Sequence, residues 1–244
     1  MKITWALVLI FLLAFGFYTA AQESGGSRRI PTVEELYLRH PSLAAVMEKA
    51  TSTDRDTKLL ALDDIEEMIE TGNMGKDEGD GVYDMLTILS AEGTSTVRLE
   101  NHRLVNNFPI VRRRAVELMG RMARESADDD RKQGAIDSII LVLERDDEVM
   151  VKSEAAYALG VIGDDKDGKI VRMLAEIIAR QSTVAPDNNF AYAVTLAIDK
   201  IAKENNGIKD YRGYTALVTI MQGNYTRKVK DKAFEVLQSL KNYR

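Results

Sequence analysis

Residues 151–164, with the sequence VKSEAAYALGVIGD, carry the pattern that decides the fold of this chain. Five apolar residues of this stretch recur at helical intervals and form one stripe along a helix: Val151, Ala155, Ala158, Leu159 and Ile162. The small residues on the same helix, Gly160 among them, leave room for the backbone of a neighbouring helix. The stretch therefore predicts an amphipathic helix that packs closely against another helix.

Similar stretches occur at regular distances on both sides of this one. Their first residues are Thr57, Val111, Val151, Phe190 and Val229, at steps of 54, 40, 39 and 39 residues. All but the last are followed by a second apolar helical stretch, such as residues 135–143 and 170–178. A pair of helices every ~40 residues is the period of stacked helical repeats, which bury a continuous core between neighbouring pairs. The sequence predicts an all-α chain built as a right-handed α-solenoid of about four and a half units.

Residues 151–164 resemble one known repeat family. They are similar to the HEAT repeat in its phycobilisome-lyase-like form, which is written roughly D-x-x-VR-x-x-A-x-x-ALG-x-IGD. Arg112 matches the arginine of this pattern, Lys58, Lys152 and Lys230 replace it, and the copy at Phe190-Ala191 departs from it. The resemblance covers about residues 53–244, and it implies an armadillo-like superhelix while saying little about function.

The first 21 residues predict export. Lys2 is the only charged residue before Glu23, an apolar or neutral run follows it, and Thr19-Ala20-Ala21 offers small residues for cleavage. This order is typical of a secretory signal peptide, so we expect a periplasmic or secreted protein. The alternative is an uncleaved membrane anchor, because the run nearly reaches the ~20 residues that span a bilayer. Residues 22–31 are polar and rich in Gly and Ser, which predicts a flexible linker.

The remaining chain divides into an N-terminal cap and the repeat array. Residues 32–52 predict two short helices, split at His40-Pro41, that cover the first unit. Residues 53–244 form the array, and an insertion at residues 90–107 lengthens its first step from about 40 to 54 residues. Long connections in compact arrays are often functional. The insertion thus supplies three candidate partner-binding residues, Arg98, His102 and Arg103, and the alternative is a tolerated surface loop or a short covering helix.

Two further sets of residues are candidates for partner binding. Tyr211, Arg212 and Tyr214 belong to a second helix of a unit, and the resemblance implies that such helices line the concave side. Tyrosine and arginine are favoured anchors of protein interfaces, although these residues could equally pack between helices. The second set, Arg112, Arg113 and Arg121, is a candidate basic patch; its alternative is a solvated helix face with pairs to nearby acids such as Glu117.

The sequence lacks the motifs of common catalytic and metal sites. It has no cysteine, its histidines His40 and His102 show no ligand spacing, and no phosphate loop, G-x-S-x-G or HExxH motif occurs. Asp165-x-Asp167-Gly168 fails as a calcium loop in either register, which favours a helix-to-helix turn with capping carboxylates. The net charge of −5 gives no indication of nucleic-acid binding. We therefore expect no cofactor and no catalytic residue.

These observations predict a non-catalytic scaffold or adaptor that works outside the cytoplasm and binds a protein partner through its surface. A lyase-like enzyme or an enzyme accessory factor is the first alternative, which the resemblance raises and the export signal opposes. A membrane-tethered assembly factor is the second, and it requires that residues 1–21 stay attached.

Overall fold

The computed structural model describes residues 32–72, 74–95 and 97–243, and the predicted signal peptide and linker lie outside them. The described chain is all-helical, as expected, apart from one two-stranded hairpin. No helix in these three ranges is both long and apolar enough to cross a membrane.

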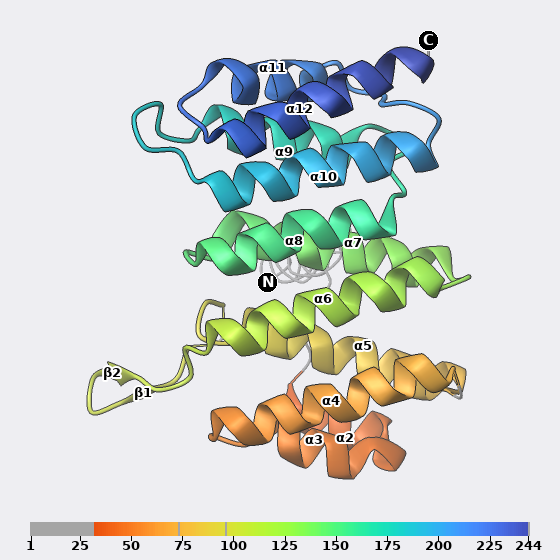
Figure 1. The fold of residues 1–244 in the computed structure, drawn as a ribbon. Coiled ribbons are helices and arrows are strands. Elements are labelled where there is room, and N and C mark those ends of the chain that lie inside the picture. The colour runs from red at the N-terminus through yellow and green to blue at the C-terminus, as the bar shows by residue number, and fades with distance from the viewer. Residues whose placement is uncertain (1–31, 73, 96, 244) are drawn as a thin grey trace, which may run out of the picture.

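The elements follow one another in a simple order (Figure 1). They are α2 (Val33–Arg39), η1 (Pro41–Leu43), α3 (Ala44–Thr51), α4 (Arg55–Thr71), α5 (Lys76–Ala91), β1 (Leu99–Glu100), β2 (Arg103–Leu104), α6 (Pro109–Glu125), α7 (Asp129–Arg145), α8 (Val149–Ile162), α9 (Lys169–Ala179), α10 (Asn188–Glu204), α11 (Arg212–Gln222), α12 (Arg227–Ser239) and η2 (Leu240–Tyr243).

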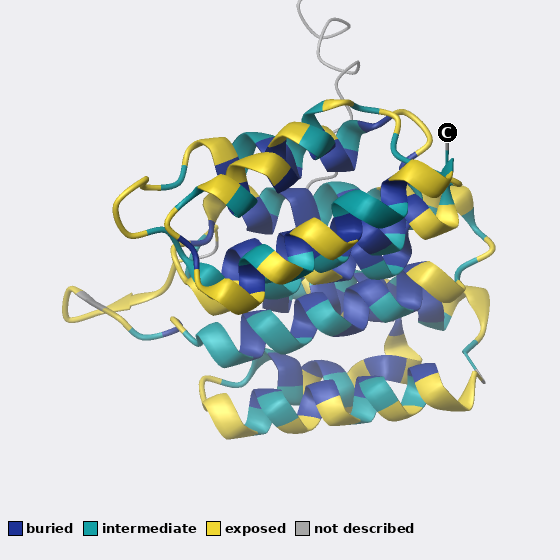
Figure 2. Cartoon of the chain, turned by 45° about the horizontal axis from the view of Figure 1, so that its top comes forward, coloured by how far each residue is buried: buried dark blue, intermediate teal, exposed yellow. Residues whose placement is uncertain are grey.

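The helices from α4 onward alternate between two layers. The front layer holds α4, α6, α8, α10 and α12, each packed on the next, and the rear layer holds α5, α7, α9 and α11 (Figure 1). Buried residues gather where the layers face each other, and exposed residues lie on the outer surfaces and connections (Figure 2). One continuous apolar core therefore runs between the layers, from Leu43 near the N-terminal end to Leu240 near the C-terminal end.

Glycines allow the front-layer helices to pack closely. A Cβ atom added at Gly120 of α6 would lie 2.8 Å from Cβ of Ala158 in α8. A Cβ atom added at Gly160 of α8 would lie 2.5 Å from Cα of Ala197 in α10. The same contact thus recurs one step along the layer, and the close approach that the sequence predicts at Gly160 is confirmed.

Carboxylates and glycines set the helix ends. Asp54 begins α4 by accepting a hydrogen bond from the Thr57 N–H at 2.7 Å, and this bond lowers the pKa of Asp54. Gly163 ends α8 in the left-handed region, at φ 72°. In the turn that follows, buried Asp165 accepts hydrogen bonds from the N–H groups of Ile170 and Val171, at 2.8 and 3.1 Å. The turn thus uses its acid to cap α9, in agreement with the turn interpretation.

A buried ion pair fixes α6 against the connection before α8. The Arg112 guanidinium binds both carboxylate oxygens of Asp146, at 2.6 and 3.1 Å, and both side chains are almost fully buried. Its third nitrogen donates to the Asn107 side chain at 2.7 Å and to the Glu92 carbonyl at 3.2 Å. Each of the three guanidinium nitrogens of Arg112 therefore donates to at least one acceptor.

The insertion folds as a β-hairpin that projects from the layers (Figure 1). β1 and β2 pair antiparallel with Leu99 opposite Leu104, and the turn residues Asn101 and His102 have φ values of 48° and 62°. Two positive φ values are what a two-residue hairpin turn requires. The sequence does not predict this hairpin, because its strands have two residues each and give no alternating pattern.

Candidate functional site

The beginnings of the front-layer helices share one edge of the molecule, which we call the N-terminal edge. It consists of the first turns of α6, α8, α10 and α12 with the connections that precede them (Figure 1). Some of the exposed apolar side chains of the described residues lie there: Val97, Leu99 and Leu104 on the hairpin, and Val149, Met150 and Val184 at the beginning of α8 and before α10.

A groove of about 740 Å³ opens on this edge, and we call it the edge groove. Side chains from four helices line it, among them Ile110 of α6, Met150 of α8, Tyr192 of α10 and Val229 of α12. These residues come from four successive repeats of the sequence pattern, so the groove exists only because the front helices lie side by side. Its lining combines apolar and aromatic side chains with polar ones.

Two buried polar atoms in the edge groove have no hydrogen-bond partner among the described residues. They are Nε of Arg113 and Oγ of Ser153. Arg113 also forms an ion pair of 3.5 Å with Glu154. Burial is the main cause that raises the pKa of Glu154, and the neighbouring Glu117 raises it further. A buried donor without a partner carries a desolvation cost.

Two tyrosines of the edge groove lie beneath lysine side chains. Nζ of Lys200 is 5.2 Å from the ring centre of Tyr157, and Nζ of Lys228 is 5.3 Å from that of Tyr192. Both distances fall within the range of cation–π contacts. Of the two lysines, Lys228 lines the groove and brings a positive charge to it.

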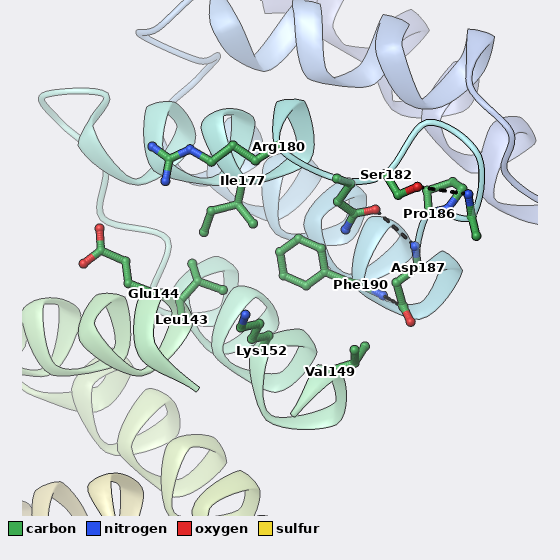
Figure 3. A pocket seen from close by; sticks show the side chains of 12 residues that line it. Leu143, Glu144, Val149, Lys152, Ile177, Arg180, Ser182, Pro186, Asp187 and Phe190 are labelled. Atoms are coloured by element: carbon green, nitrogen blue, oxygen red, sulfur yellow. Dashed lines mark hydrogen bonds between the residues drawn. The ribbon is translucent and has the colours of Figure 1, made fainter. Parts of the chain in front are cut away.

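A second cavity, of about 470 Å³, adjoins the groove, and we call it the loop pocket (Figure 3). It lies between the end of α7, the beginning of α8, and the connection from α9 to α10. Leu143, Ile177 and Phe190 give it an apolar wall, and Lys152 brings a positive charge. Both cavities share Val149 and Asp187 in their linings, so they form one continuous region of the N-terminal edge.

The candidate residues of the insertion lie on the projecting hairpin. Arg98 is exposed, and its N–H donates to the Asn106 side chain at 2.8 Å. His102 is exposed in the turn, and Arg103 belongs to β2 opposite Glu100. The hairpin places these residues on the N-terminal edge beside the beginning of α6 (Figure 1), and none of them lines the edge groove.

The candidates in α11 lie at the other edge, where that helix begins (Figure 1). Tyr211 is 73% exposed, whereas Tyr214 is half-buried against the core. Arg212 forms an ion pair of 3.0 Å with Glu176 of α9. The structure thus separates these residues from the hairpin candidates, and none of the three lines either cavity.

The three arginines of the candidate basic patch have different surroundings. Arg112 is buried and paired with Asp146, so it is not part of an exposed patch. Arg113 contributes to the edge groove, and Arg121 is paired with Glu66 and, at 3.1 Å, with Glu70 of α4. The patch that the sequence groups together is therefore divided between the core, the groove and a bridge between helices.

Lys152, Ser153 and Phe190 line the two cavities, but the sequence does not mark them as site residues because each occupies an ordinary position of the helical pattern. A comparison of the copies with one another contains the only signal that could have found them.

Across the described ranges, no group of three or more His, Cys, Asp or Glu residues is arranged to hold a metal ion. Comparisons with protein-family models, with curated proteins and with solved structures find no match to this chain.

Proposed function

We propose that this protein is an exported, non-catalytic scaffold of HEAT-like helix pairs, stacked as a right-handed α-solenoid, that binds a protein partner in the edge groove. The observation that carries the proposal is the groove itself, in which side chains of four front-layer helices meet, among them Met150, Tyr157 and Tyr192.

The composition of the groove supports a polypeptide partner. Met150, Tyr157 and Tyr192 offer adaptable and aromatic contact surface, and residues of these types are enriched at protein interfaces. The repeating contact of Gly120 with Ala158, and of Gly160 with Ala197, supports the stacked arrangement. In such stacks each unit adds to one extended binding surface.

Site-directed crosslinking tests the proposal. A photoreactive phenylalanine analogue placed at Met150, which is 43% exposed in the groove, should trap one partner from the cell envelope. The matched position is Val218, which is 37% exposed on α11 in the rear layer and does not line the groove. Identical crosslinked products from both positions would contradict binding in the groove.

The trapped partner must then be purified and its affinity for the chain measured. Tyr157→Ala removes a large contact from the groove, so the dissociation constant should rise about tenfold or more. Tyr211→Ala removes the same type of side chain at the other edge, where it is 73% exposed, and should leave the affinity unchanged. If Tyr211→Ala weakened binding and Tyr157→Ala did not, the partner would bind at the beginning of α11 and not in the groove.

Export is tested separately by mass spectrometry of the mature N-terminus. A chain that begins at Gln22 supports an exported scaffold. A chain that begins at Met1 and sediments with membranes supports the tethered assembly factor instead.

A further inference from the structure

The fourth residue of every front-layer helix from α4 to α12 occupies a matching place in the repeat. These residues are Lys58, Arg112, Lys152, Ala191 and Lys230. The first two are buried cations with partners. Lys58 donates to the Ala50 carbonyl at 2.7 Å and pairs with Glu92 at 3.0 Å, and Arg112 pairs with Asp146. In these first two units the place thus holds a cation together with an acid.

In the third unit Lys152 supplies the cation, but no acid among the described residues pairs with it. Its ammonium group makes no hydrogen bond and no ion pair with any residue that the structure describes, and the side chain is half-buried at the wall of the loop pocket. The copies at Val151 and Phe190 are 39 residues apart, so the residue that corresponds to Asp146 in the next unit is Ala185. Ala185 lines the same pocket as Lys152. The chain therefore has a methyl group where the preceding unit has its carboxylate.

The pocket beside Lys152 has room for a ligand and an apolar wall to hold it. Its volume of about 470 Å³ falls within the range of small-ligand sites. Leu143, Ile177 and Phe190 face this space together with Lys152 (Figure 3). A ligand that brings an acid to the lysine can bury an apolar group against these three side chains.

The other polar groups of the pocket already have partners or lie in solvent. Arg180 is exposed and pairs with Glu176 at 3.6 Å, and Asp187 accepts a hydrogen bond from the Phe190 N–H at 2.8 Å. Gln181 accepts from the Asp187 N–H, Ser182 accepts from the N–H groups of residues 184 and 185, and Glu144 is exposed at the end of α7. A solvated carboxylate such as Glu144 acts more weakly on a ligand than the half-buried lysine does.

We propose that the loop pocket binds a carboxylate joined to an apolar group. The ligand carboxylate pairs with Lys152 in the way that Asp146 pairs with Arg112, and the apolar group packs on Leu143, Ile177 and Phe190. This inference does not depend on the edge groove, because a ligand can fill the loop pocket whether or not a protein partner binds beside it.

Calorimetry on the unaltered protein gives the first test. We expect 4-phenylbutanoate to bind about tenfold or more tightly than 4-phenylbutan-1-ol, because the alcohol has a similar shape and no charge. Equal affinities, or no binding of the carboxylate, would overturn the proposal. This comparison needs no variant, so it cannot fail through misfolding.

Two substitutions give the second test. Ala185→Asp supplies the missing acid, so it should abolish binding of 4-phenylbutanoate and raise the melting temperature. Lys152→Met should remove the preference for the carboxylate over the alcohol and keep the pocket wall. Lys166→Met removes an exposed lysine from the turn after α8 and serves as the control for lost charge. If Ala185→Asp binds the carboxylate as the unaltered protein does, the pairing is wrong.

A third comparison identifies the source of the carboxylate. A short peptide that ends in phenylalanine with a free carboxyl group is compared with the same peptide as its C-terminal amide. Binding of the free peptide at least as tight as that of 4-phenylbutanoate assigns the pocket to a chain terminus. Binding of 4-phenylbutanoate alone assigns it to a small free carboxylate, and both results support the proposed chemistry.

Discussion

At the scale of single residues, the buried pair of Arg112 and Asp146 shows how an ordinary repeat position acquires a special role. Both side chains are removed from solvent, and Asp146 also accepts a hydrogen bond from the Glu148 N–H at 2.9 Å, next to the beginning of α8. The aspartate thus joins α6 to α8 by charge and orders the connection by hydrogen bonding. A buried pair of this kind depends on both of its members.

Asp146→Asn should destabilise the protein by about 3–5 kcal/mol, because it leaves the Arg112 charge buried without an opposite charge. The free energy of unfolding is measured by urea denaturation followed by circular dichroism. Adding Arg112→Met to this variant removes the isolated charge and should recover part of the loss. A double variant less stable than Asp146→Asn alone would show that the neutral hydrogen bonds of Arg112 matter more than its charge.

Glu154 gives a prediction about pH. Burial raises its pKa in the folded protein above the unfolded value of about 4.3, so folding favours its protonated form. The favourable contribution is complete below the unfolded pKa and is lost as the pH rises through the folded pKa. Relative to the unaltered protein, Glu154→Gln should therefore gain stability as the pH is raised from about 4 to 7. Urea midpoints at several pH values measure this, and a difference that does not change with pH would contradict it.

At the scale of elements, the spacing of the front-layer helices depends on small residues at fixed places. Gly160 meets Ala197 of the next helix, and Gly120 meets Ala158 in the same manner. Glycine weakens an isolated helix, so its use inside α6 and near the end of α8 indicates that close packing outweighs helix propensity there.

Gly160→Ala should destabilise the protein by about 1–3 kcal/mol, because the added methyl group would overlap the α10 backbone and force the helices apart. Gly79→Ala in α5 is the matched control, since its methyl group would meet only the flexible side chain of Arg131. The control should be neutral or slightly stabilising. Thermal melts compare the two, and an equal loss in both variants would show that the effect does not come from helix spacing.

We expect that the hairpin strands can be removed without a large loss of stability only if the flanking residues Glu92 and Asn107 are kept. Deleting residues 90–107 takes away Glu92 and Asn107, which contact the buried cations Lys58 and Arg112, and should cost several kcal/mol, since about 3–5 kcal/mol follows the loss of one partner of a buried pair. Replacing only residues 97–104 with a Gly-Ser link should change stability by less than about 1 kcal/mol. Urea denaturation compares the two variants. If the short replacement also unfolds the protein, the hairpin is part of the core structure.

The sequence predicts the helices well because their determinants are local. The apolar stripe, the glycine that ends α8 and the acids that begin α4 and α9 lie within a few residues of the ends they control. The hairpin and the partners of the arginines depend on contacts between distant residues, such as Arg121 with Glu66, 55 residues away. The loop pocket depends on a difference between two copies, with alanine at position 185 in place of the acid at position 146. The pattern of one copy cannot show such a difference, which becomes visible only when the copies are aligned with one another.

At the scale of the whole molecule, the packing pairs each helix mainly with its neighbours. In the front layer α12 packs on α10, and at the other end α4 packs on α6 and α3. In the solenoid that we propose, stability is a sum over units and the interfaces between them, so one end can be weakened while the other stays folded. A single globular core would respond as one unit instead.

Truncation after Gly223 distinguishes these two forms of cooperativity. It removes α12, whose buried residues include Val229, Ala233 and Val236, and it uncovers the faces of α10 and α11 on which α12 packs. Amide hydrogen exchange, measured by mass spectrometry, should show protection lost in α10 and α11 and kept in α4 and α5, because no packed pair of helices joins α12 to the N-terminal units in the described chain. The matched control is Arg227→Ala, which alters an exposed residue of α12 and should leave protection unchanged throughout. Loss of protection in every helix after truncation would mean that the chain folds as one cooperative body, and the proposed stack of semi-independent units would then be wrong.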